Sequence, residues 1–317
     1  MTKVKVFLLP LLIMSTLIHT SNVMAGEEVS RSISSENITN VMIDNRSGSV
    51  NVVGWDKDKI SLSGELGDEV ESLTFKQKGA QAYIKVEYPN TSGWNSSGSA
   101  LTIFMPKHIS VDFTGVSSEL ALSNLHGGIE AGTVSGDIVA KDLSHNIELS
   151  SISGNISSSD LSGKISLSVV SGDIDDNNSQ GRLQIKTVSG HIVSESVASE
   201  VSLNIVSGDS DLSLADVVEL RVSTVSGDVD VKLALKDKGL LKASSVSGNL
   251  QFIFQKDINA DFALESNVGG DLINKLSDVK AKEAKYGPSS TLNFQMGDGS
   301  STVRVNTVSG NVIVKGD

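Results

Sequence analysis

The chain has 317 residues, of which 38% are hydrophobic and only 4% aromatic, with 26 Lys and Arg against 38 Asp and Glu. This composition fits a core of small aliphatic side chains, and the net charge of −12 argues against partners such as nucleic acid or anionic lipid. Because the chain has no cysteine, disulfides, thiol catalysis and Cys-ligated metals are excluded.

The first 25 residues have the features of a secretory signal peptide. Lys3 and Lys5 precede an almost unbroken apolar run at residues 7–18, and small residues follow at 23–25. The run of about 12 residues is shorter than the ~20 that span a bilayer, so we expect cleavage after Ala25 and no transmembrane segment thereafter. This predicts an exported protein, either periplasmic or extracellular.

Residues 27–115 alternate apolar and polar side chains in several short segments. Strands are predicted at 50–52, 60–62, 82–86 and 101–104. Because an open sheet edge must be covered, we expect residues 27–115 to form an N-terminal β cap that continues into the repeats that follow.

From residue 116 to the end, the tripeptide Ser-Gly-Asp, Ser-Gly-Asn or a near relative recurs. We interpret its glycines as structural turn residues, because glycine followed by Asp or Asn suits a corner between strands. The predicted turn glycines are Gly136, Gly154, Gly172, Gly190, Gly208, Gly227, Gly248, Gly270 and Gly310. The first five are 18 residues apart.

Apolar residues recur at the second, seventh, eleventh and sixteenth positions after each glycine, and we expect all four columns to be buried. The second position holds Ile138, Ile156, Ile174 and Ile192, and the seventh holds Leu143, Leu161, Ser179 as an exception, and Val197. The eleventh holds Ile147, Ile165, Leu183 and Val201, and the sixteenth holds Val134, Ile152, Val170, Val188 and Val206.

An 18-residue unit cannot bury such columns alone, whereas stacked units can. The predicted fold is therefore an all-β, single-stranded parallel β-helix (solenoid) of 18-residue coils over residues 116–317. An insertion is expected at about 273–300, where residues 273–285 form either a short helix or an ordered loop.

The repeated Val-Ser-Gly-Asp/Asn motifs, the opening segment 45–56 (NRSGSVNVVGWD) and the closing VSGNVIV resemble the bacterial "putative adhesin" β-strand-repeat family of unknown function. The resemblance covers nearly all of residues 40–317. It implies a right-handed β-helix in the cell envelope, and it brings no catalytic residues with it.

The residue after each glycine is the sharpest candidate for a site. Asp137, Asp173, Asp209 and Asp228 could bind a cation such as Ca²⁺, which prefers oxygen ligands. However, Asn155, His191 and Asn249 interrupt this column, and turn-forming Asx residues explain it without a metal. We therefore predict no metal, no cofactor and no catalytic residue, with the cation column as the alternative.

The sequence also contains an acidic cluster and a pair of histidines in consecutive repeats. Asp173, Asp175 and Asp176 form the densest acidic patch, which we interpret as a solvated loop. His126 and His145 occupy nearby positions in consecutive repeats and could approach each other, without a recognisable triad or zinc spacing.

These observations favour a non-enzymatic binding or structural module with long polar faces. Its partner is unknown; a cell-surface glycan, peptidoglycan or an envelope protein would suit such faces. The alternatives are an enzyme acting on polysaccharide, either a lyase or a glycosidase, and a scaffold that assembles end to end.

Overall fold

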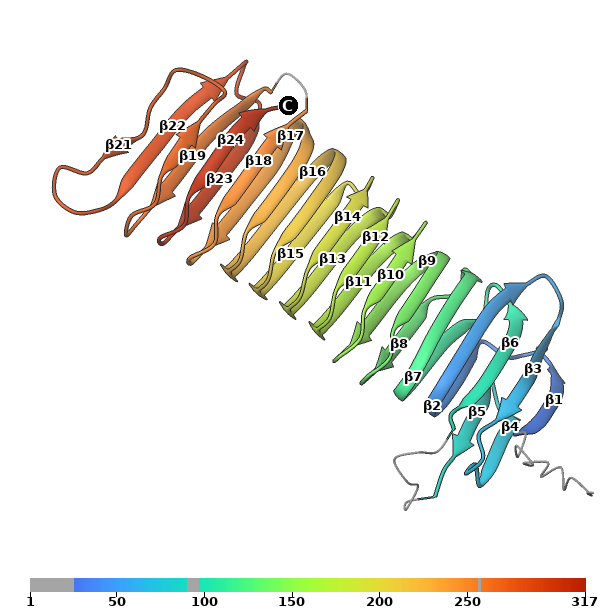
Figure 1. The fold of residues 1–317 in the computed structure, drawn as a ribbon. Helices are drawn as coiled ribbons and strands as arrows, with labels where there is room; N and C mark the ends of the chain where they lie inside the picture. The colour runs from blue at the N-terminus through green and yellow to red at the C-terminus, as the bar shows by residue number, and fades with distance from the viewer. Residues whose placement is uncertain (1–25, 90–96, 256–257) are drawn as a thin grey trace, which may run out of the picture.

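The computed structural model describes residues 26–89, 97–255 and 258–317. These residues form an elongated stack of strands that run across its long axis (Figure 1). All secondary-structure elements in the described part of the chain are strands, and the segment at 273–285 contains turns and short strands where a helix was one alternative. Within the described ranges, no helix is long and apolar enough to cross a bilayer. The predicted signal peptide lies outside the described residues.

The strands fall into three groups along the stack. The N-terminal group is β1 (Glu27–Ser34), β2 (Asn40–Trp55), β3 (Lys59–Leu66), β4 (Ser72–Lys78), β5 (Gln81–Glu87), β6 (Ser99–Pro106) and β7 (Ser110–Leu125). The central group is β8 (Ile129–Thr133), β9 (Ile138–Ser151), β10 (Ile156–Ser159), β11 (Ser162–Ser171), β12 (Ile174–Asn177), β13 (Gln180–Ser189), β14 (Ile192–Ser196), β15 (Glu200–Ser207), β16 (Ser210–Ser226), β17 (Val229–Ser245) and β18 (Leu250–Phe254). The C-terminal group is β19 (Ala260–Ser266), β20 (Leu272–Asn274), β21 (Lys282–Glu283), β22 (Ser290–Met296), β23 (Ser301–Thr307) and β24 (Val312–Gly316). The four strands predicted within residues 27–115 are confirmed, in β2, β3, β5 and β6.

Parallel pairing joins residues one repeat apart in the central group. Ile138 pairs with Ile156, Ile156 with Ile174, and Ile174 with Ile192, each 18 residues further along the chain. The same register joins β9, β11 and β13 on another face. Equivalent side chains of successive repeats therefore lie side by side.

The predicted fold class, a single-stranded parallel β-helix of 18-residue coils, is wrong. Strand pairing in the centre closes into an eight-stranded parallel ring, in the order β9, β10, β12, β14, β16, β15, β13, β11 and back to β9. The ring closes because β9 and β16 each bend through a corner and pair on both faces. Other strands lie outside it. Repeat spacing shows which residues are level with one another, but not where strands continue through corners.

Antiparallel strands, which a parallel β-helix lacks, cover both ends. At the N-terminal end β1 pairs with β3, β3 with β6, and β4 with β5 in antiparallel register. At the C-terminal end β22 pairs antiparallel with both β19 and β21. These strands lie at opposite extremes of the stack (Figure 1).

Strands β2 and β23 each lie inside the stack, between strands that come later or earlier in the sequence. Strand β2 lies between β7 on one side and β5 and β6 on the other, all in parallel register. Strand β23 likewise lies between β17 and β19. The repeat at Gly310 is therefore placed between those at Gly248 and Gly270, whereas the order of the motifs along the sequence suggested that it would come last.

The core includes the columns at the second, seventh and eleventh positions after the glycine, and Leu143 and Leu161 of the seventh position are buried as expected. Ile138, Ile156, Ile165 and Leu183 of the other two columns are fully buried, also as expected. The column at the sixteenth position was wrongly predicted to be buried, since its members are 40% to 49% exposed. Val197 of the seventh position is exposed as well.

Strand alternation explains the exposed column. Ile165, Leu167 and Val169 point inward at every second position of β11. Val170, the next residue, must therefore point outward where the strand reaches its corner. A regular valine spacing indicates stacking, but it does not indicate which side of the strand the valine occupies.

Candidate functional site

The corner at each Val-Ser-Gly-Asx motif brings successive backbones into very close contact. A Cβ added at Gly154 would lie 2.1 Å from the carbonyl oxygen of Gly136, and one at Gly172 would lie 2.3 Å from that of Gly154. Among the predicted turn glycines, only Gly190, Gly208, Gly227 and Gly270 have positive φ. The close approach of neighbouring repeats thus requires glycine even where the backbone conformation would accept another residue.

The residue after the glycine forms a ladder of hydrogen bonds along this corner. The Asp137 Oδ1 atom accepts the backbone N–H of Asn155 at 2.8 Å, and Asn155 Oδ1 accepts that of Asp173 at 2.9 Å. Asp173 Oδ1 accepts the N–H of His191, and Asp209 Oδ1 that of Asp228, at 2.8 and 2.9 Å. Each side chain therefore satisfies the backbone donor of the next repeat, a role that Asp and Asn fill equally well.

His191 differs from the other members of this ladder. Its ring contacts Asp211, with Nε2 3.4 Å from Oδ2, and no carboxylate or amide oxygen is available there for the N–H of Asp209. In the described part of the chain, no group of three or more His, Asp or Glu side chains is arranged to hold a metal. In the column considered as the alternative cation site, Asp137, Asp173, Asp209 and Asp228 each accept a backbone N–H of the next repeat through Oδ1; the N–H that Asp137 accepts is that of Asn155.

A second Asx file, which sequence reasoning missed, occupies another corner. Asn124, Asp142, Asp160 and Asn178 all have φ between 52° and 58°, a left-handed conformation that Asn and Asp tolerate better than other residues. Asn178 Nδ2 donates to Asp160 Oδ1 at 2.7 Å, and Asn124 Nδ2 donates to the Gly54 carbonyl at 2.8 Å. Their 18-residue spacing, six positions after each glycine, was the signal in the sequence.

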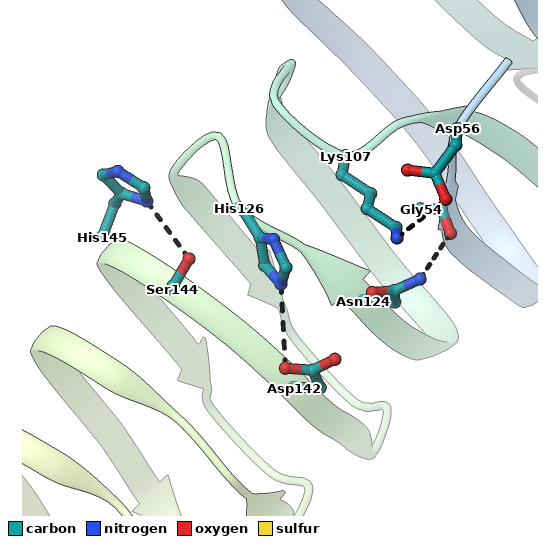
Figure 2. A network of polar contacts seen from close by, with 8 residues as sticks. All are labelled: Gly54, Asp56, Lys107, Asn124, His126, Asp142, Ser144 and His145. Atoms are coloured by element: carbon teal, nitrogen blue, oxygen red, sulfur yellow. Dashed lines mark hydrogen bonds and ion pairs between the residues drawn. The ribbon is translucent and has the colours of Figure 1, made fainter.

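The two candidate histidines lie beside this second file but have separate partners (Figure 2). His126 Nε2 is 3.7 Å from Asp142 Oδ1, whereas His145 Nδ1 is 3.2 Å from the hydroxyl of Ser144. Neither His126 nor His145 therefore bridges a serine and a carboxylate as a nucleophilic triad would require. The contacts fit polar residues at a solvated corner.

The acidic patch at residues 173–176 divides between solvent and core. Asp175 is exposed, but Asp176 is only 1% exposed, so the interpretation as a wholly solvated loop is wrong for Asp176. Its Oδ1 accepts hydrogen bonds from Ser158 at 2.7 Å and Ser179 at 2.6 Å, and its Oδ2 accepts one from Ser194 at 3.1 Å. Burial raises the pKa of the Asp176 carboxyl, and the three hydroxyl donors oppose that effect.

Ser179 occupies the seventh position after the glycine, where the preceding repeats have leucine. Its hydroxyl donates a hydrogen bond to the buried Asp176, and this accounts for the exception. Since Asp175 and Asp176 point to opposite sides of strand β12, they cannot act together on one substrate as the paired carboxylates of a glycosidase do.

A shallow groove lies on the outer face of β13, β15 and β16 in the central repeats. It encloses about 230 Å³ and is lined by Arg182, Glu200, Val201, Ser202, Glu219 and Arg221. We call it the polar groove. Arg182 and Glu200 are strand partners, with Nη2 2.7 Å from Oε2, and Arg221 forms an ion pair with Glu219.

A row of polar side chains leads from the polar groove across the same sheet. Ser166, Gln184, Ser202 and Arg221 follow one another in register on β11, β13, β15 and β16. The arginine and glutamate side chains of the groove remain between 32% and 62% exposed, so their donors and acceptors are available to a ligand. The groove itself offers hydrogen bonds of both kinds with two positive and two negative side chains, and the exposed Lys164 and Lys186 add positive charge to the face beside it.

The fold and this site define an elongated all-β repeat protein with regular, solvent-exposed polar faces. The chain belongs to the Toastrack DUF4097 family, whose model matches residues 32–315. The search among curated proteins gives no match.

Several solved structures resemble the chain at 11% sequence identity. A "putative cell adhesion protein" from Clostridium sporogenes has a TM-score of 0.24, with 92% of this chain and 100% of that chain covered. A "putative lipid binding protein" from Parabacteroides distasonis has a TM-score of 0.42, with 91% and 97% covered. A "putative adhesin" from Parabacteroides merdae has a TM-score of 0.39, with 92% and 97% covered. At such identities and scores, no function is transferred from them.

Proposed function

We propose that the protein is an exported, non-enzymatic binding module that recognises a glycan of the cell envelope or its surroundings through the polar groove. The observation that carries the proposal is the groove itself, where Arg182, Glu200 and Glu219 lie in strand register on one exposed face and Arg221 lies in the next row, in register with Ser202. The predicted signal peptide supports the location.

The chemistry of the groove suits an uncharged polyhydroxylated ligand. Sugar hydroxyls both donate and accept hydrogen bonds, and the guanidinium and carboxylate groups of the groove supply both counterparts. The neighbouring Ser166, Gln184 and Ser202 repeat the same pattern along the stack. A polymer of repeating sugars could therefore make several weak contacts at once, and their sum would give useful avidity.

A binding experiment with purified protein tests the proposal. Peptidoglycan sacculi and a glycan array are probed with the protein and with Arg182→Ala/Arg221→Ala, while reducing-sugar release is measured in parallel. We expect binding by the unaltered protein, a loss on the order of tenfold or more in the variant, and no sugar release.

The matched control is Arg304→Ala, which removes an arginine paired with Asp261 outside the groove. Absence of binding to every glycan, equal binding by the groove variant, or released sugar would each contradict the proposal.

A further inference from the structure

A continuous file of exposed β-branched side chains follows the Val-Ser-Gly-Asx corner from the level of β7 to that of β19. We call it the valine file. In spatial order its members are Val116, Val134, Ile152, Val170, Val188, Val206, Val225, Val246, Val308 and Val268. Backbone hydrogen bonds set this order: Ser135 N–H donates to the Val116 carbonyl, Ser309 N–H to that of Val246, and Val268 N–H to that of Val308.

The valine file is a large apolar surface for a chain with so many charges. Its members are between 38% and 60% exposed, so the ten together present on the order of 600 Å², as much as the largest patch on a typical monomer. An exposed serine follows each valine in the central repeats, for example Ser153, Ser171 and Ser189. These hydroxyls and the Asx ladder would bring a contact close to the ~800 Å² that each partner buries in a stable complex.

We propose that the valine file is the interface between two copies of this chain. The file repeats at the strand spacing, about 4.8 Å, over nine steps. A second copy has the same repeat, so the two files stay in register over their whole length. A partner helix laid along the file would not match it, because its pitch of about 5.4 Å differs from the strand spacing and the mismatch would exceed one full step over nine steps.

The acidic ladder determines how the two copies are oriented. Asp137, Asp173 and Asp209 lie on one side of the valine file, three residues further along the chain than its members. A two-fold axis parallel to the stack puts the two ladders on opposite sides of the interface, so the copies run in the same direction. An antiparallel pair would bring the two ladders face to face, and their like charges would repel.

Sedimentation equilibrium of the purified protein tests the interface. We expect a dimer with a dissociation constant on the order of 10 μM. Because two acidic copies repel each other, dimerisation strengthens as the ionic strength rises from about 0.05 M to about 0.5 M.

The test variant is Ile152→Lys/Val206→Lys, which places two charges on the valine file. The matched control is Val139→Lys/Val193→Lys, in which the replaced residues are 51% and 37% exposed, lie on β9 and β14 outside the valine file, and have the same separation of three repeats. We expect the test variant to weaken the dimer at least a hundredfold and the control to leave it unchanged, with equal thermal unfolding of both variants. The proposal is overturned if the unaltered protein is still monomeric at a concentration ten times the expected dissociation constant. It is also overturned if the test variant dimerises as well as the unaltered protein.

Cysteine cross-linking tests the orientation, since the chain has no cysteine of its own. In a parallel pair Val134→Cys lies level with its own counterpart and forms a disulfide dimer on mild oxidation. In an antiparallel pair it lies opposite Val308, near the other end of the file. Cross-links that form only between Val134→Cys and Val308→Cys overturn the parallel arrangement. The groove variant Arg182→Ala/Arg221→Ala should dimerise normally, so failure of the glycan proposal and failure of this one are separable.

Discussion

The central repeats and the two ends of the stack differ in the side chains that form their cores and in the direction of their strand pairing. In the centre, β9 to β16 pair in parallel over 18- and 19-residue intervals and bury Ile, Leu, Val, Ser and Thr. At the C-terminal end, Phe262 stacks on Phe294 with ring centroids 4.4 Å apart and meets Phe254 edge-on. Antiparallel strands cover the outermost edge at both ends.

This difference shows that uniform side chains suffice where each repeat lies on another like itself. An end has no further repeat to stack on, so larger rings and reversed strands must close it. An uncovered edge would present unpaired backbone donors and acceptors to other chains. The predictions below test this division, from the largest expected effect to the smallest.

Removing a ring from the C-terminal end should cost the most. Phe262→Ala deletes a fully buried ring and should lower the free energy of unfolding by about 3–4 kcal/mol. We also expect it to promote aggregation on mild heating, because the covering strand β22 loses its packing. The comparison is Leu167→Ala in the centre, which should lose about 3 kcal/mol without aggregation. Calorimetry and light scattering measure the two effects, and aggregation of both variants alike would contradict the division.

Adding a methyl group at the crowded Val-Ser-Gly-Asx corner should lower the free energy of unfolding almost as much as the loss of the Phe262 ring. Gly172→Ala forces a Cβ to 2.3 Å from the Gly154 carbonyl oxygen, so the repeats must separate, at about 2–3 kcal/mol. In Gly132→Ala, the control, the new Cβ meets only the Ser150 hydroxyl at 3.2 Å. Urea denaturation of both variants is the measurement. Equal midpoints would show that the corner is not tightly stacked.

Replacing the buried carboxylate should stabilise the centre. Because burial holds the pKa of Asp176 above its ordinary value of 3.8, the folded state binds the proton more tightly, and stability falls as pH rises through this range. Asp176→Asn keeps the shape without the charge and should add about 1 kcal/mol at pH 7. The gain should disappear below about pH 4, where the carboxyl is protonated in both states. Thermal unfolding of both proteins between about pH 3 and pH 7 measures this difference. If Asp176→Asn is less stable than the unaltered protein at pH 7, the three serines favour the charged form.

Completing the Asx ladder should give the smallest effect. His191→Asn supplies an amide oxygen for the N–H of Asp209, as Asn155 does for Asp173, and should add about 0.5–1 kcal/mol. Asn155→His is the converse change and should lose a similar amount. Thermal unfolding of both variants measures this. Opposite signs support the ladder, and two losses would mean that His191 contributes through its contact with Asp211.

The polar site was the least predictable part of the molecule. Arg182 and Glu200 are one repeat apart, as are Ser202 and Arg221, so the repeat spacing places them side by side; they were not singled out because arginine and glutamate do not recur in every repeat. The role of Asp176 was hidden for the same reason, since its partners Ser158 and Ser194 are one repeat away on either side but no neighbouring repeat carries an Asp at this position. The glycine column and the Asx column that follows it were visible because nearly every repeat carries a copy, whereas the second Asx file was overlooked.

Periodicity along the chain was enough to establish the strands and the residues that stack, because both depend on side chains at a fixed spacing. It was also enough to place Ile138, Ile156 and Ile174 in the core. Only the tertiary structure showed three features. The side chains of the valine file point outward, the strand pairing closes through β9 and β16, and β23 lies between β17 and β19. Each of these follows from how the backbone turns at corners and ends, where side-chain spacing carries no information.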